Sequence, residues 1–353
     1  MNAFSVSRSA LGSVAAGGAI ALLMTIGGLI AGPHSAATSS RHPSAASSQA
    51  AGSASVTLVP PTSAEPAGPA DPNTSLSLYG GPIAATAFVA SYPQLKVIAD
   101  QPQATWLVPE VYPEPAAMIS TLLSKAANRT LQLVVAGVPN RDNGGYSRGG
   151  VHTASQYYSW VNAIGAAVGN AKAIVILEPN SLALSSRLKD VGVSHQREGM
   201  LANAARILKK RPNVRVYIDA SMWIPVHKQA SLLSQAGIGL VDGFAVNVAG
   251  FDRLSTDYAY GDALSALVGG KHYIVDTSRS GQGRVGNHWC NPAGRGLGPL
   301  PQGKPAGHPL ADALLWVKHP GESDGGCDGA PSVGTFWPKY AMGLVARANF
   351  AVN

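Results

Sequence analysis

Residues 175–182 read Val-Ile-Leu-Glu-Pro-Asn-Ser-Leu, an apolar run that stops on Glu178, Pro179 and Asn180. A short, continuous apolar run predicts a strand that is covered on both faces, and a proline ends such a strand. Polar side chains placed where a buried strand emerges are candidates for chemistry. An amide does not supply a proton at neutral pH as a carboxyl group does, so the residue at position 180 bears directly on function.

The same unit, an apolar run with a polar tip and then a helix-compatible stretch, recurs along the chain. Seven apolar runs predict strands, over residues 105–109, 131–137, 173–178, 214–220, 243–248, 272–277 and 314–319. Helix-compatible stretches such as residues 116–127 and 196–210 lie between them. This alternation predicts an α/β fold with a parallel sheet and right-handed crossovers. Seven repeats around one core favour a (β/α) barrel, with a doubly wound open sheet as the competing arrangement.

The N-terminal part of the chain differs in composition from the rest. Residues 10–32 carry no charge and follow a weakly basic start, which predicts a secretory signal over residues 1–33. The uncharged run is also long enough to cross a bilayer, so tethering by residues 10–32 is the alternative. Residues 34–72 are rich in Ser, Ala and Pro, which predicts a disordered linker. We therefore expect a secreted protein whose folded domain spans residues 73–353.

Composition and motifs argue against several classes of function. The net charge is +7 with only 13% charged residues. The sequence has no basic stripe with interleaved aromatics, so we expect no nucleic-acid partner. The sequence lacks a metal-binding His pair, a nucleophile elbow, a Walker motif and an Asp-x-Asp motif, so we expect no metal, cofactor or nucleotide. Cys290 and Cys327 fit one disulfide in an oxidising compartment, with free thiols as the alternative.

Polar residues at the strand tips would meet at one rim of a parallel barrel. The tips are Asn140-Arg141-Asp142, Glu178-Pro179-Asn180, Asp219, Asn247, Asp276 with Arg279, and Lys318 with Glu322 and Asp324. Each alone fits a turn, a helix cap or a surface ion pair, but their number favours a site. Carboxylate pairs cleave glycosidic bonds, and flat aromatic rings such as those of the chain's tryptophans stack on sugars.

Several motifs, in their order along the chain, closely resemble glycoside hydrolase family 6, the cellulases and cellobiohydrolases of that name. They are Asp276–Gly283 (DTSRSGQG), Trp289–Arg295 (WCNPAGR), Trp316–Lys318 (WVK) and Pro320–Gly325 (PGESDG), with residues 139–147, 176–181, 217–220 and 247–248 in agreement. The resemblance covers about residues 75–350. It implies a distorted seven-stranded parallel barrel and cleavage of β-1,4-glucan with inversion. We expect a monomer whose partner is a β-glucan chain.

The resemblance also implies roles for single residues. Asn180 occupies the position of the general acid, the Asp of a Glu-Pro-Asp motif. Asp324 matches the residue that assists the attacking water, Asp142 matches an aspartate that tunes the acid, and Asp219 matches a third acid near the site. The residues that resemble the sugar-binding set are Trp106, Trp223, Asn247, Trp289, Lys318 and Glu322. The pair Cys290–Cys327 matches the second disulfide of the family.

Several positions depart from the family pattern. Ala136 stands where the family has Tyr, and Asn143 stands where it has a Cys of a first disulfide. After Asp219 the tip is two residues short and lacks the usual His. Together with Asn180, these losses predict impaired hydrolysis, with a non-catalytic glucan binder as the alternative. Strand geometry would put Glu178 on the side of Asn180 but about 6–7 Å deeper, so we expect it to pair with Arg141 or Lys318 instead of replacing the acid.

Overall fold

The computed structural model describes residues 76–188 and 191–352. The expected signal or anchor, residues 1–33, and the expected linker, residues 34–72, lie outside the described residues. Within those residues, no helix combines the length and the apolar character that crossing a membrane requires.

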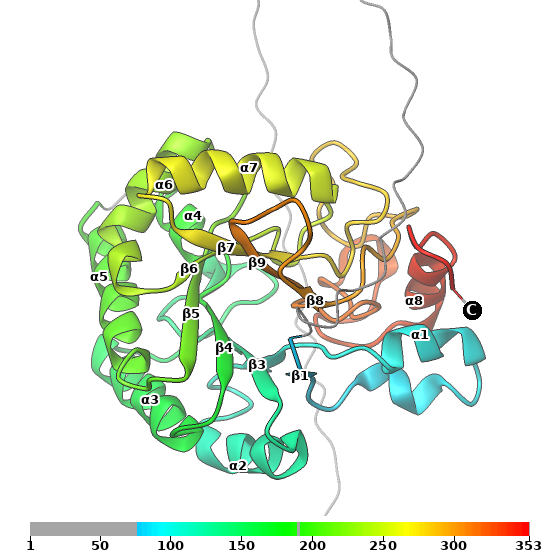
Figure 1. Cartoon of the computed structure of the whole chain (residues 1–353), viewed down its shortest axis with the longest axis horizontal. Helices are drawn as coiled ribbons and strands as arrows, with labels where there is room; N and C mark the ends of the chain where they lie inside the picture. Colours follow the sequence, from blue (N-terminus) through cyan, green and yellow to red (C-terminus); the bar gives the residue numbers. More distant parts are fainter. Residues whose placement is uncertain (1–75, 189–190, 353) are drawn as a thin grey trace, which may run out of the picture. The chain divides into compact units, whose positions relative to one another are not determined.

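The described strands form one curled sheet, which Figure 1 shows inside an arc of helices. Its strands are β1 (Leu78–Tyr79), β2 (Thr105–Leu107), β3 (Thr130–Val135), β4 (Ala173–Leu177), β5 (Val214–Asp219), β6 (Gly243–Val246), β7 (His272–Asp276), β8 (Gln302–Gly303) and β9 (Ala311–Leu315). Seven of them run parallel in the order β2-β3-β4-β5-β6-β7-β9. The short strand β1 also pairs with β3, and β8 pairs antiparallel with β9.

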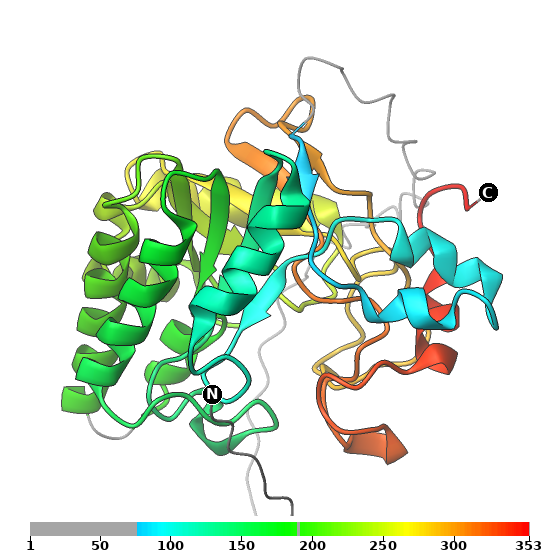
Figure 2. The ribbon, with the colours of Figure 1, turned by 90° about the horizontal axis from the view of Figure 1, so that it is seen from below.

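Helices follow most of the parallel strands and cover the outer face of the sheet. They are α1 (Lys96–Ala99), α2 (Pro115–Ala126), α3 (Ala154–Val168), α4 (Ser181–Ser185), α5 (Val191–Leu208), α6 (Val226–Gln235), α7 (Leu254–Leu267) and α8 (Pro338–Val345). Local sequence sets their starts: Thr153 and Gln156 form a capping box before α3, and prolines begin α2 and α8. In Figure 2, α1 and α8 lie side by side on the other side of the molecule from α3 and α5.

Alternate residues of each strand pack on opposite faces of the sheet. In β3, Leu133 and Val135 belong to the core beneath the outer helices. Val134 belongs to a second cluster inside the barrel, with Ile176 of β4 and Tyr217 of β5. Both faces are therefore apolar, which explains why the strands read as continuous apolar runs.

The two edges of the curled sheet meet along a line that we call the seam. Gln103, just before β2, forms one parallel backbone bridge with Trp316, just after β9, and the Ala104 amide donates to the Trp316 carbonyl at 3.1 Å. The Trp106 indole donates to the Val317 carbonyl at 2.9 Å. The expected distorted α/β barrel is thus confirmed, although the described sheet has nine strands instead of seven, and one isolated backbone bridge joins its two edges.

All seven predicted strands are present, but the last one is shifted. The prediction placed it at residues 314–319, whereas β9 is Ala311–Leu315, because the chain from Trp316 onward bonds across the seam. The strands β1 and β8 have two residues each, too few to show a hydrophobic period, and so were not predicted from the sequence.

Candidate active site

The two polar residues after β4 turn towards opposite neighbours. Glu178 (φ 53°) and Asn180 (φ 62°) both have left-handed backbone, so the chain has left strand geometry. Glu178 is 1% exposed, and its Oε1 accepts from the Gly137 amide after β3 at 2.7 Å. Asn180 instead contacts residues after β5. The expectation that strand geometry places both side chains on one side is therefore wrong.

Glu178 carries the features of a buried acid that does not face solvent. Burial raises the pKa of Glu178 to about 7, although the Gly137 amide favours the charged form. In the described part of the chain it forms no ion pair with Arg141 or Lys318, contrary to expectation. Arg141 pairs with Glu110 at 3.2 Å, and Lys318 lies near Asp324. Glu178 is thus a buried acid that is partly protonated near neutral pH.

Asn180 lies in a hydrogen-bonded cluster with three residues at the end of β5. Its Oδ1 accepts from the Ser221 hydroxyl at 3.0 Å and from the Trp223 indole at 3.1 Å. Its backbone amide donates to Asp219 Oδ2 at 2.8 Å, and Ser221 donates to the same oxygen at 2.7 Å. The side chain at position 180 is therefore held in one orientation by its neighbours.

Asp219 is the buried carboxyl group of this cluster. It is 3% exposed, and its Oδ1 has no hydrogen-bond partner among the described residues. Burial raises the pKa of Asp219 to about 7, and the nearby charge of Asp276 acts in the same direction, while the bonds from Ser221 and Asn180 oppose it. Asp219 is thus a second acid that holds a proton near neutral pH.

Asp324 lies in a second cluster, formed by the segments after β7 and β9. Arg279 Nη1 lies 2.8 Å from both oxygens of Asp324, Lys318 Nζ lies 3.7 Å away, and the Asn291 amide donates at 3.1 Å. Burial disfavours the charge of Asp324, but Arg279 and Lys318 outweigh it and hold the pKa of this carboxyl below its usual range. Asp324 is therefore a carboxylate at neutral pH.

The loop after β3 carries Asp142 and reaches the loop that carries Asp324. Asp142 shapes its own loop by accepting from the Ser147 amide at 2.8 Å. A Cβ placed on Gly325 would lie 2.4 Å from the ring of Tyr146, which therefore lies flush against this glycine. Tyr146 also packs against Trp289, with ring centroids 6.0 Å apart. The contact brings the two loops with the expected catalytic aspartates together.

Two other residues at the strand tips brace the rim. Asp276 is 1% exposed, and its carboxylate accepts four backbone amides, those of Ala249, Ser278, Val317 and Lys318. Asn247 is 4% exposed, and its side chain bonds within the protein, to Asp252, Asp257 and the Asp276 carbonyl. Asn247 therefore holds its own loop in place, and a role in sugar binding stays a prediction.

The tryptophans expected to bind sugar differ in exposure. Trp289 is 60% exposed. Trp223 and Trp106 are half-buried. The Arg187 guanidinium lies over the Trp223 ring, 4.1 Å from the ring centroid. The Trp106 indole donates to the Val317 carbonyl across the seam. Only Trp289 offers a largely open ring face in this structure.

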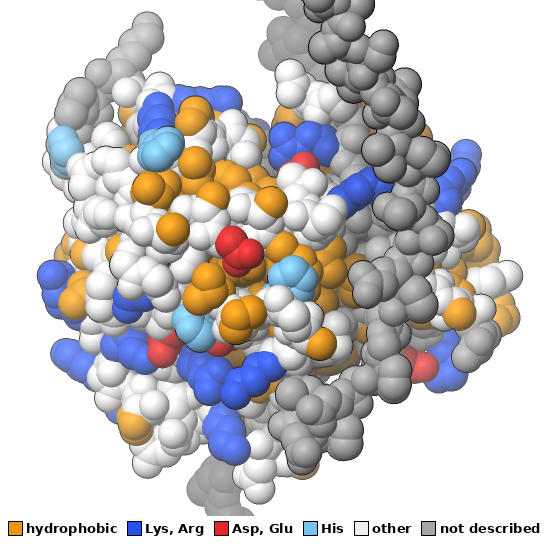
Figure 3. All heavy atoms as spheres, turned by 45° about the horizontal axis from the view of Figure 1, so that its top comes forward, with side chains coloured by type: hydrophobic (Ala, Val, Ile, Leu, Met, Phe, Trp, Pro, Cys, Tyr) orange, Lys and Arg blue, Asp and Glu red, His pale blue; other side chains and the backbone are white. Residues whose placement is uncertain are grey.

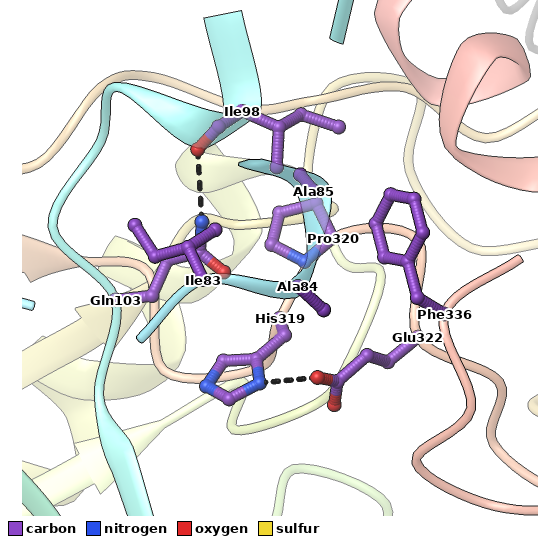
Figure 4. Close-up of a pocket in the computed structure, with 9 residues that line it drawn as sticks. All are labelled: Ile83, Ala84, Ala85, Ile98, Gln103, His319, Pro320, Glu322 and Phe336. Carbon is purple, nitrogen blue, oxygen red and sulfur yellow. Dashed lines mark hydrogen bonds and ion pairs between the residues drawn. The ribbon is translucent and has the colours of Figure 1, made fainter. Parts of the chain in front are cut away.

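Glu322, expected to bind sugar, bonds with His319, as Figure 4 shows. Its Oε1 lies 2.7 Å from His319 Nδ1, and His319 Nε2 lies 2.6 Å from the Ala104 carbonyl. Two acceptors therefore face the two ring nitrogens. Burial lowers the pKa of His319, but the interaction with Glu322 outweighs burial, and the net effect is a raised pKa. The small pocket here is filled by its own lining, Ile83, Ala84, Ala85, Ile98, Gln103, His319, Pro320, Glu322 and Phe336.

The positions that depart from the family pattern have local partners. Asn143 donates to the Leu184 carbonyl at 3.1 Å and accepts from Arg197 at 3.0 Å, so hydrogen bonds join this loop to α4 and α5. Ala136 is 2% exposed, and its carbonyl accepts from Arg141. Hydrogen bonds thus anchor the loop at the position of the absent first disulfide.

The disulfide between Cys290 and Cys327 is confirmed, with Cα atoms 6.4 Å apart. Among residues 76–188 and 191–352, no group of three His, Cys, Asp or Glu side chains is placed to hold a metal ion. On the face in Figure 3, Lys and Arg side chains lie in separate groups with neutral and apolar side chains between them.

Local sequence did not predict several contacts of the site. Arg279 and Asp324 are 45 residues apart, and Tyr146 meets Gly325 from another loop, so only the fold brings them together. His319 and Glu322 are three residues apart in the sequence, and this spacing was the one signal that a local pair was present.

The chain is similar in sequence to a known enzyme family and to several of its members. The model of the family described as "Glycosyl hydrolases family 6" matches residues 84–348. Endoglucanase A of Cellulomonas fimi is 40% identical over 262 residues, which cover 72% of this chain and 56% of that protein. Endoglucanase A of Thermobispora bispora is 34% identical over 229 residues, which cover 63% of this chain and 49% of that protein. The chain thus spans about half the length of these two relatives.

Solved structures agree with the fold. An endoglucanase of Mycobacterium tuberculosis, in complex with methyl-cellobiosyl-4-deoxy-4-thio-β-D-cellobioside, superimposes with a TM-score of 0.71 at 33% identity. The match covers 77% of this chain and 99% of that one.

Proposed function

Because the chain belongs to family 6 of the glycosyl hydrolases, we propose that it binds β-1,4-glucan chains and hydrolyses them with inversion, at a reduced rate. The observation that carries this proposal is the arrangement around Asp324, a buried carboxylate kept charged by Arg279 and Lys318. An inverting glycosidase needs such a carboxylate to assist the attacking water. The reduced rate follows from Asn180, since general-acid assistance is worth about 10²–10⁴ in rate.

Glucan binding without turnover is the second candidate, and Asn180 is the observation that favours it. Trp289 is largely exposed, so a stacking contact between its ring and a sugar would not depend on the acid. Under both candidates we propose a secreted monomer, with a signal over residues 1–33 and a linker over residues 34–72 before a folded domain over residues 73–353.

The test uses the full chain with soluble cello-oligosaccharides. We expect calorimetry to detect binding, and NMR of fresh products to show the inverted α-anomer first. Trp289→Ala is the matched binding control, because this exposed ring can be removed without opening the core; we expect affinity to fall about tenfold. Absence of binding to cello-oligosaccharides would reject the proposed function, and binding without any product would select the second candidate.

A further inference from the structure

We propose that a relay from Asp219 through the Ser221 hydroxyl to the side-chain amide of Asn180 supplies the proton that the leaving glycosidic oxygen takes up. This inference rests on the proposed function and names the group that replaces the missing acid. Asn180 is the residue that touches the sugar, while Asp219 and Ser221 act through it.

The orientation of the Asn180 amide follows from its donors. The Trp223 indole is a donor only, so the atom 3.1 Å from it must be the amide oxygen. The NH₂ group is then on the other side. Nδ2 has no hydrogen bond within the described residues, yet it is not among their buried, unpartnered atoms. It is therefore not fully enclosed by the described residues, and in the proposal it donates to an oxygen of the bound sugar.

The Ser221 hydroxyl connects this amide to Asp219. It lies 2.7 Å from Asp219 Oδ2 and 3.0 Å from Asn180 Oδ1, but a hydroxyl has one proton to donate. When Asp219 is ionised, that proton satisfies the carboxylate. When Asp219 is protonated, it donates to Ser221, and Ser221 donates to Asn180. Only the protonated state gives a continuous chain of donors from Asp219 to the amide.

The surroundings of Asp219 favour the protonated state near neutral pH. The carboxyl is buried, its Oδ1 has no partner among the described residues, and burial raises its pKa to about 7. The titratable groups that face it are Asp276 on β7 and Tyr260 on α7, and neither is a cation. The Arg187 guanidinium stacks on the Trp223 ring.

The transfer balances in atoms and charge. As the glycosidic C–O bond breaks, an Asn180 Nδ2–H proton moves to the leaving oxygen. Oδ1 takes the Ser221 proton, and Ser221 takes the Asp219 proton. Asn180 is then an imidic acid and Asp219 a carboxylate. The attacking water passes its proton to solvent by way of Asp324. A solvent proton returns to Nδ2, and the Oδ1 proton passes back through Ser221 to Asp219.

Ser221 lies two residues after Asp219, the last residue of β5. Ala220 continues the strand direction, since its amide bonds to the Ala245 carbonyl of β6 at 2.8 Å, and Ser221 follows at once, 6% exposed. Glu178, another buried acid with a raised pKa, faces β3, on the opposite side of the chain from this cluster.

The experiment compares the full chain with Ser221→Ala and Ser221→Thr, each also in the Asn180→Asp background, on soluble cello-oligosaccharides. In the unmodified chain we expect Ser221→Ala to lower kcat at least about tenfold and Ser221→Thr to retain part of it. In the Asn180→Asp background, where a carboxyl group touches the sugar, Ser221→Ala should cost no more than about threefold. Because the relay needs protonated Asp219, turnover of the unmodified chain should fall as pH rises through about 7. Melting curves and oligosaccharide binding check that each variant is folded.

Equal loss from Ser221→Ala in both backgrounds would overturn the relay, since that pattern marks a structural role. An unmodified chain that binds oligosaccharide but does not turn over, beside an active Asn180→Asp variant, would also overturn it and leave glucan binding intact. No binding by any variant would reject the proposed function itself.

Discussion

Replacing Asn180 by Asp should restore a working general acid, and the geometry predicts its protonation. Asn180 Oδ1 and Asp219 Oδ2 bind the same Ser221 hydroxyl at 3.0 and 2.7 Å, so the new and existing carboxyl groups would be no more than about 6 Å apart. At an effective dielectric constant of about 20, two charges at that distance repel by about 3 kcal/mol. That repulsion raises the pKa at which the pair loses its last proton by about two units, a hundredfold shift towards the state that holds one proton.

One proton shared at neutral pH is what a general acid requires. The expected gain in kcat is about 10²–10⁴ over the unmodified chain. Reducing-end release from cello-oligosaccharides measures it, and NMR of the first product reports whether the anomer is inverted. Asn180→Ala is the matched control, because it removes the amide without adding an acid and should show no gain. A folded, oligosaccharide-binding Asn180→Asp variant with unchanged kcat would refute the reasoning and shift the defect to the other altered positions.

Three further predictions concern stability. Reducing the Cys290–Cys327 disulfide, which closes 37 residues, should lower the free energy of unfolding by about 2–4 kcal/mol in denaturant titrations; an unchanged midpoint would contradict this. Arg279→Met removes the closer of the two cations beside the buried Asp324 carboxylate, leaving Lys318 at 3.7 Å, and should cost about 3 kcal/mol in the same assay, so a loss below 1 kcal/mol would count against the pairing. His319 has a raised pKa through Glu322, so its contribution is complete below the ordinary His pKa and is lost as pH rises through the folded value. The melting-temperature difference between the unmodified chain and His319→Gln should therefore shrink from pH 6 towards pH 9, and a constant difference would disprove the charged pair.

The strands and the rim were predictable because each follows from local pattern. Continuous apolar runs such as residues 173–178 marked strands covered on both faces, and parallel pairing brings their polar ends to one edge. The directions of individual side chains were not predictable in the same way. Left-handed backbone at Glu178 and Asn180 sends these two residues to different neighbours, although they are only two positions apart. Asn247 looked like a sugar ligand by position, but it bonds inside the protein.

The single bridge that closes the barrel has a consequence for local unfolding. Five residue pairs register β3 against β4, whereas the seam has one bridge, from Gln103 to Trp316. Local opening with few hydrogen bonds broken has a low free energy, so amide hydrogens at the seam should exchange with deuterated water well before those of β3 and β4. The Ala104 amide marks this line, which runs beside the loop that carries Asp324. We therefore expect the seam to open more readily than the β3–β4 pairing, next to the carboxylate that the proposed chemistry depends on.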